Sequence, residues 1–243
     1  MKIIIVDNYL GVGAKGAEIV AGEINKNKKL VLGLATGETM IPFYRSLIKM
    51  AKSKKINIKG IKTFNLDEYA GFGKDNKDSY YHFMDKNFFS KVGIPAENVN
   101  FLNGKNKNLN LECKNYEKMI KKFGGIDLQV LGIGRDGHIG FNEPGSKFNS
   151  KTRMVLLSKL TRKDNSRFFG HKLERVPKKS LTMGISTIMS ARKILLLASG
   201  ANKAEIIHRA LHGEVNAKVP ASFLQRHKNV IVILDKDAGS ELD

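Results

Sequence analysis

Three ionisable side chains, Asp136, His138 and Glu143, lie close together in the stretch LGIGRDGHIGFNEPGS, residues 131–146. A histidine titrates near neutral pH, and a carboxylate hydrogen-bonded to it fixes its tautomer and raises its basicity. Two carboxylates around one imidazole therefore suit proton transfer, and they need no cofactor for it. The alternative interpretation is a histidine that only satisfies backbone groups in a tight loop.

Metal binding is a second interpretation of the same side chains. The spacing D-x-H-x4-E would supply oxygen and nitrogen ligands, but no further His or Cys follows nearby in the sequence. His208 and His212 lie four residues apart on an expected helix, where ordinary surface residues are the simpler interpretation. We therefore predict no metal site.

Two segments match the glycine pattern G-x-G-x-x-G of dinucleotide-binding proteins, GVGAKG at 11–16 and GIGRDG at 132–137. In the first, the residues DNYL separate the glycine from the preceding apolar run, and the second leads into FNEP rather than into a clear helix. A phosphate-binding loop of the type G-x-x-x-x-G-K-[ST] is absent from the sequence. We therefore expect no nicotinamide, flavin or other cofactor.

The elements that position these motifs follow a regular rhythm. Short apolar runs alternate with amphipathic stretches along the chain, which is typical of repeated β-α units. They predict one α/β domain over residues 1–243: an open, doubly wound, mainly parallel sheet of the Rossmann-like type with helices on both faces. Residues 146–180 break the rhythm with a polar, basic and irregular sequence. We expect this segment to be a mobile flap, or lid, over a site.

Polar clusters follow several of the expected strands. In a parallel sheet, ligands bind beyond the carboxyl ends of the strands, near the point where the strand order reverses. For a single cluster, a solvated turn or a helix cap is the alternative. Several clusters at one edge favour a site, and they comprise 36–39, 67–68, 135–138 and 202–203.

Composition limits the partners and the compartment. The formal net charge is +19, but the basic residues are mostly scattered Lys without interleaved aromatic residues for base stacking. We therefore expect no nucleic-acid partner, although the positive field would attract an anionic ligand such as a sugar phosphate. Cys113 is the only cysteine, and no apolar run suits a signal peptide or a membrane span. These features predict a cytoplasmic protein without a membrane partner, and they leave the oligomeric state open, a homo-oligomer included.

Longer motifs resemble the glucosamine-6-phosphate deaminase family in order and spacing over nearly the whole chain. They include FNLDEYAGF, DSYYHFMDKNFF, LGIGRDGHIGFNEPGS, VPKKSLTMGISTI and ASGANKAEIIHRAL. The combination of DGHIGFNEPGS with an upstream FNLDEY is specific, because the related 6-phosphogluconolactonases share only the Asp-Gly-His core. The resemblance implies an enzyme that converts glucosamine 6-phosphate and water to fructose 6-phosphate and ammonia without a cofactor. A lactonase and a non-catalytic sugar-phosphate-sensing domain are the alternatives.

The resemblance also implies roles for individual residues. Asp67 would be the base that takes the C2 proton of the sugar and passes it to C1. His138 would open the pyranose ring by proton transfer at the ring oxygen, with Asp136 and Glu143 positioning it and sharing its charge. The substrate phosphate would bind among Thr36, Gly37, Thr39, the flap residue Arg167, and Lys203 at the start of a helix.

Glu38 departs from the family pattern. The family loop usually reads Thr-Gly, then Gly or Ser, then Thr-Pro, whereas this chain has Glu38 after the glycine and Met40 in place of the proline. A glutamate aimed at a phosphate would repel it. We therefore expect Glu38 to point away from the phosphate or to alter the specificity of the site.

Overall fold

The apolar runs form a seven-stranded sheet in the computed structural model, which describes residues 1–242. Its strand order is β1-β10-β9-β6-β2-β3-β5, and all neighbouring strands are parallel. The expected open, mainly parallel sheet is thereby confirmed. The strands are β1 (Lys2–Val6), β2 (Val31–Leu34), β3 (Lys62–Asn65), β5 (Val99–Asn100), β6 (Leu128–Leu131), β9 (Lys193–Ala198) and β10 (Val230–Asp235).

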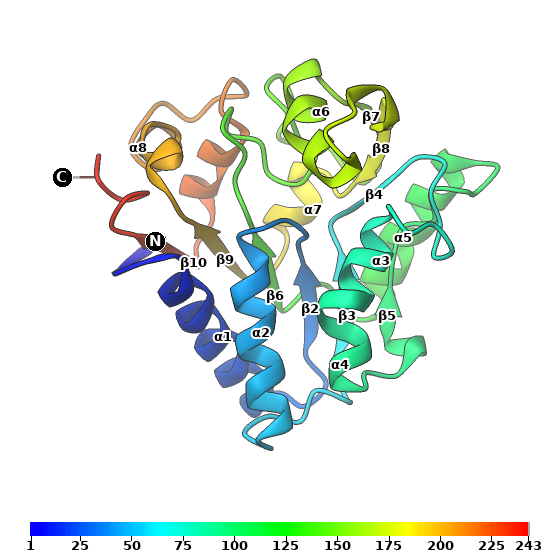
Figure 1. Ribbon diagram of the computed structural model, residues 1–243, viewed down its shortest axis with the longest axis horizontal. Helices are drawn as coiled ribbons and strands as arrows, with labels where there is room; N and C mark the ends of the chain where they lie inside the picture. The colour runs from blue at the N-terminus through cyan, green and yellow to red at the C-terminus, as the bar shows by residue number, and fades with distance from the viewer. Residues whose placement is uncertain (243) are drawn as a thin grey trace.

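The helices cover both faces of this sheet. Connections that run towards β5 and connections that run back from it lie on opposite faces, because β-α-β crossovers are right-handed. The first set lies in front of the sheet in Figure 1 and comprises α1 (Tyr9–Lys26), α2 (Met40–Lys52), α3 (Tyr80–Met84) and α4 (Ser90–Val92). The second set comprises α5 (Leu109–Lys122), α7 (Ile185–Met189) and α8 (Ala204–Leu211).

The strand order reverses beside β2. From β2 the chain runs outward to β3 and β5, then returns to β6 on the other side of β2. Both β2 and β6 are buried along their whole length, as expected for central strands covered on both faces. The loops that leave these two strands therefore lie at the position where open α/β sheets bind ligands.

A second, three-stranded antiparallel sheet was not expected from the sequence. Its order is β4-β8-β7, formed by β4 (Asp67–Tyr69), β8 (Lys179–Thr182) and β7 (Arg153–Leu156). The flap is thus more regular than its sequence indicated, since 146–180 also contains α6 (Lys159–Asn165) and a 3-10 turn at Ser166–Phe169. A small separate core joins the flap, which lies at the upper right of Figure 1, to the body of the protein. It consists of Tyr69, Phe141, Leu157, Phe169 and Val176.

Two further observations concern the helices and the ends of the strands. Within residues 1–242, no helix is both long and apolar enough to cross a bilayer. The carboxyl ends of β9, β6, β2 and β3 are neighbours, and the flap covers this same edge. The polar clusters named from the sequence all follow these four strands, so they converge on one region.

The glycines of α1 explain how closely α1 packs on α2. A Cβ added at Gly13 would lie 2.6 Å from Pro42 and from the Phe43 backbone nitrogen, whereas a Cβ at Gly22 would meet nothing within 4 Å. Gly13 is therefore needed for the close approach of the two helices, and Gly22 is not.

We expect Gly13→Ala to lower the free energy of unfolding by about 1–3 kcal/mol, because the added methyl group overpacks the contact between α1 and α2. Gly22→Ala in the same helix is the matched control, and it should raise the free energy of unfolding by about 0.5–1 kcal/mol through helix propensity alone. Urea denaturation of the three proteins measures both effects. Equal stabilisation by the two substitutions would refute the close contact.

Candidate active site

The loop after β6 holds His138 against Asp136. Nδ1 of His138 lies 2.6 Å from Oδ1 of Asp136, and the His138 backbone N–H donates to the same oxygen at 3.2 Å. Burial raises the pKa of Asp136, but the hydrogen bond and the charge of His138 outweigh it, so the pKa lies below its usual value. The ionised carboxylate orients the imidazole and leaves Nε2 as the nitrogen that can exchange a proton with a ligand.

The glycines of this loop make room for the imidazole. A Cβ at Gly134 would lie 2.1 Å from Cε1 of His138, so the ring lies directly against the backbone at that residue. Gly137 has a φ of +83°, a conformation that favours glycine. The glycines at 132–137 thus make room for the His138 ring. This explains why the segment is not followed by the helix of a dinucleotide-binding motif.

Asp67 approaches the same loop from the other side. It begins β4, pairs with Thr182 of β8 and is 6% exposed. A Cβ on Gly140, two residues after His138, would lie 3.5 Å from Oδ2 of Asp67. Burial, together with the neighbouring charge of Glu68, raises the pKa of Asp67 well above its usual value. Among residues 1–242 no group donates a hydrogen bond to the Asp67 carboxyl, whereas the neighbouring Glu68 carboxylate accepts three backbone N–H groups. The Asp67 oxygens are therefore available to a ligand.

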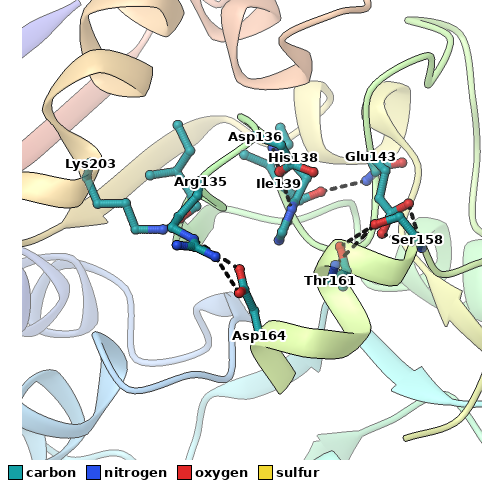
Figure 2. Close-up of polar contacts among 11 residues, drawn as sticks. Arg135, Asp136, His138, Ile139, Glu143, Ser158, Thr161, Asp164 and Lys203 are labelled. Atoms are coloured by element: carbon teal, nitrogen blue, oxygen red, sulfur yellow. Dashed lines mark hydrogen bonds and ion pairs between the residues drawn. The ribbon is translucent and has the colours of Figure 1, made fainter. Parts of the chain in front are cut away.

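Glu143 has a different partner from the one expected. Both of its carboxylate oxygens accept the backbone N–H of Ser158 at 3.0 Å, and Ser158 is the N-cap of α6 (Figure 2). No hydrogen bond links Glu143 to His138 within the described part of the chain. Glu143 therefore holds the start of the lid helix. No contact in the described residues supports its expected role in positioning the imidazole.

The loop after β2 contains the three expected binding residues Thr36, Gly37 and Thr39. Thr39 is the N-cap residue of α2. Gly37 has a φ of +118°, and a Cβ added there would meet nothing within 4 Å. Backbone N–H groups at the start of a long helix attract anions. The loop is therefore open and suited to binding a negatively charged group.

Lys203 and Arg167 bring positive charge to this loop. Lys203 follows β9 and donates to the Ile133 carbonyl at 2.8 Å, and burial lowers its pKa to about 8. Arg167 comes from the lid and lies close enough to Lys203 for its charge to lower that pKa further. Arg167 Nη1 also lies 2.9 Å from Oε2 of Glu38, so Glu38 points towards the lid.

Two lid contacts could not be foreseen from the sequence. Arg135 donates to both carboxylate oxygens of Asp164 on α6, at 2.6 and 3.2 Å (Figure 2). Asn165 donates to the Tyr69 hydroxyl at 2.9 Å. Arg135 lies within the motif at 131–146, but nothing in its spacing pointed to a partner 29 residues away.

Of the expected site residues, Asp67 is buried, Arg167 is exposed and the others are partly exposed. A hollow of about 330 Å³ includes Glu68, and another of about 470 Å³ includes Glu143, but neither is lined by Asp67 or His138. Among residues 1–242, no group of three or more His, Cys, Asp or Glu side chains is arranged to hold a metal ion. The absence of a metal from the working protein stays a prediction.

Known proteins similar to this chain match it over its full length. A family model described as glucosamine-6-phosphate isomerases/6-phosphogluconolactonase matches residues 11–233. A glucosamine-6-phosphate deaminase of Clostridium botulinum (strain Langeland / NCTC 10281 / Type F) is 48% identical over 242 residues, covering 100% of this chain and 99% of the relative. One of Clostridium novyi (strain NT) is also 48% identical and is covered completely.

Solved structures agree on the fold. A structure described as a monomeric glucosamine-6-phosphate deaminase aligns with a TM-score of 0.96 and 42% identity, over 99% of this chain and 100% of that one. A 6-phosphogluconolactonase from Trypanosoma brucei aligns with a TM-score of 0.78 and 20% identity, over 100% and 98% of the two chains. At 20% identity, the lactonase supports a shared fold alone.

The lowered pKa of Lys203 predicts how anion binding depends on pH. Because only the protonated lysine attracts an anion, the affinity of the protein for an anion should be highest below about pH 8 and decline above it. We expect sulfate, whose charge is constant, to bind about 5- to 8-fold more weakly at pH 9 than at pH 7.5. Lys203→Met should bind more weakly at pH 7.5 and lose this pH dependence. Calorimetric titration tests both, and an identical pH profile in the two proteins would exclude Lys203 from the anion site.

Proposed function

The chain belongs to the glucosamine-6-phosphate isomerase/6-phosphogluconolactonase family, and from that premise we propose that it converts glucosamine 6-phosphate and water to fructose 6-phosphate and ammonia. The observation that carries the proposal is the pairing of two separate proton-transfer groups. The buried carboxyl group of Asp67, at the start of β4, lies against the loop that follows β6. This loop carries His138, whose imidazole is hydrogen-bonded to a carboxylate. Aldose-ketose isomerisation of a ring sugar needs two such groups, whereas lactone hydrolysis has no use for a carbon base.

His138 carries out the first step, the opening of the pyranose ring. Its free Nε2 passes a proton to the ring oxygen O5 as the bond from O5 to C1 breaks, and the C1 hydroxyl gives its proton to solvent water to form the open-chain aldehyde. Asp136 supports this step because its carboxylate stabilises the imidazolium form and fixes the ring orientation.

Asp67 carries out the second step, the transfer of a proton from C2 to C1. Its carboxylate takes the C2 proton while O1 gains a proton from solvent water, which yields an enolamine. Return of the proton from Asp67 to C1 then gives an iminium group at C2. Addition of water there leaves the ketone and releases ammonia and a proton, which reprotonates His138. Burial assists this step, since a carboxylate with a raised pKa is a stronger base.

The phosphate group of the substrate binds at the loop after β2, between the body and the lid. The open start of α2 at Thr36, Gly37 and Thr39 supplies backbone donors, and Lys203 and Arg167 supply charge. Binding at one end of the sugar fixes the distance of C1 and C2 from Asp67 and His138. No cofactor takes part in these steps.

The chain acts as one unit in this proposal. We take residues 1–243 as a single domain in which residues 146–180 act as the lid, closing over the sugar when the phosphate is bound. The proposed compartment is the cytoplasm, where a phosphosugar is available, and no nucleic acid or membrane is a partner. A homo-oligomer stays an open alternative, which light scattering of the purified protein can decide.

The activity is tested by giving the purified protein glucosamine 6-phosphate and measuring ammonia and fructose 6-phosphate together. The lactone of 6-phosphogluconate is supplied in a parallel reaction, and binding of duplex DNA is measured alongside. Equal amounts of the two products support the proposal. Disappearance of the lactone without any ammonia from the amino sugar would replace the deaminase by the lactonase.

We expect Asp67→Asn to lower kcat about 100-fold or more, because the amide keeps the shape of the side chain but cannot accept the C2 proton. Exchange of the C2 proton with deuterated solvent, followed by NMR, should be lost in parallel. Turnover near that of the unchanged protein would remove Asp67 from the enolisation step.

His138→Gln should affect a ring substrate more than one that is already open. We expect a loss of about 100-fold on glucosamine 6-phosphate and less than about 10-fold on its 4,5-dideoxy analogue, which has no hydroxyl at C4 or C5 to close a furanose or a pyranose. Steady-state rates on the two compounds give the ratio. Equal losses on both would assign His138 to a later step.

A further inference from the structure

Glu38 connects the binding loop to the lid. Its Oε2 lies 2.9 Å from Nη1 of Arg167, and the two residues are 129 positions apart in the chain. Arg167 has no other carboxylate within hydrogen-bonding distance in the described residues. The lid arginine assigned to the phosphate is thus already paired with a negative charge supplied by the protein itself.

Two hydrogen bonds to one carbonyl oxygen, together with the preceding glycine, hold the backbone at Glu38. The Tyr9 hydroxyl donates to the Glu38 carbonyl at 2.6 Å, and the Ile41 backbone N–H donates to the same oxygen at 2.9 Å. Gly37, directly before it, takes up the positive φ of the loop. Because the main chain is held in this way, the side chain can change partner without moving the start of α2.

Among the charged groups of the site, Glu38 is the one that is paired with Arg167 at the place where the phosphate would bind. Arg135 is held by Asp164 on both oxygens, and Lys203 is bonded to a backbone carbonyl rather than to a carboxylate. A phosphate that approaches Lys203 and the start of α2 therefore encounters Arg167 with Glu38 attached. Both anions would compete for the charge of one guanidinium group, and they would repel each other when bound to it together.

We propose that Glu38 is an internal competitor for the substrate phosphate: it occupies Arg167 in the free protein, and the phosphate displaces it when the substrate binds. This inference rests on the proposed function for the identity of the substrate. A phosphate dianion can displace the single charge of Glu38 because it carries more charge and can form two parallel bonds to the guanidinium. A carboxylate ligand can also form two parallel bonds to a guanidinium, but it carries a single charge and lacks the advantage in charge. Glu38 thereby makes the site selective for phosphate esters.

The effect of Glu38 on phosphate affinity should be moderate. The side chains of Glu38 and Arg167 are 53% and 44% exposed, and exposed ion pairs are weak and screened by salt. Loss of Glu38 should therefore tighten phosphate binding moderately at low ionic strength and much less in concentrated salt. Glu18 offers a matched control, because it pairs with Lys15 at 2.9 Å with 56% and 42% exposure, on the outside of α1.

The test is calorimetric titration of the full chain with inorganic phosphate at pH 7.5 and low ionic strength. We expect Glu38→Gln to bind phosphate about 5- to 10-fold more tightly than the unchanged protein, and Glu18→Gln to bind within about twofold of it. Thermal unfolding of each variant checks that the fold is intact. Unchanged or weaker phosphate binding by an intact Glu38→Gln protein overturns the inference.

A second experiment distinguishes displacement of Glu38 from Arg167 from simple electrostatic repulsion between Glu38 and the phosphate. In an Arg167→Gln background, the gain from Glu38→Gln should shrink to about twofold or less, because the contested guanidinium is gone. The same gain in both backgrounds would mean that Glu38 acts only through its field, and the displacement would be wrong.

Turnover is measured separately, so that failure of the inference differs from failure of the proposed function. With glucosamine 6-phosphate, Glu38→Gln should lower KM about 5- to 10-fold and leave kcat within about twofold. A protein that shows the phosphate shift but deaminates nothing would refute the proposed function alone. A protein that deaminates normally but shows no phosphate shift would refute the role of Glu38 alone.

Discussion

The site depends on the reversal of strand order beside β2. Because all strands of the main sheet are parallel, the chain leaves β9, β6, β2 and β3 at one edge, where these four strands are neighbours. The loops that follow them carry His138, residues 36–39, Lys203 and Asp67, which are far apart in the sequence. The strand order brings these loops to the same edge of the sheet, where open α/β sheets bind ligands.

The two groups proposed to transfer protons have opposite surroundings, which suit them to the separate tasks proposed for them. Asp67 is buried without a hydrogen-bond partner in residues 1–242, and its pKa is raised well above the usual value. His138 is partly exposed and bonded to a carboxylate through Nδ1, which orients the ring and leaves Nε2 available to a ligand. Separate tuning of two groups allows one site to act on oxygen in one step and on carbon in the next.

Much of this arrangement could be predicted from the sequence, because continuous apolar runs mark buried parallel strands and polar clusters mark their ends. The second sheet was missed because β4 and β8 pair across more than a hundred residues, and no local pattern reports such a pairing. Ion pairs of the lid were missed for the same reason. The apolar run RMVLL at 153–157 was a signal for β7 that the sequence offered. Glu143 was assigned to the imidazole by motif, whereas the start of α6 competes for its carboxylate.

The central claim is that Asp67, His138 and the phosphate pocket serve one ligand. A crystal structure with the open-chain analogue 2-amino-2-deoxyglucitol 6-phosphate tests it most directly. The account predicts the phosphate between Lys203 and Arg167, with Glu38 released from the arginine and C2 within about 3–3.5 Å of the Asp67 carboxylate. His138 should face the oxygen of C5 on the same molecule. A ligand that binds with Asp67 and His138 on different surfaces, or with its phosphate remote from Lys203, would contradict the account.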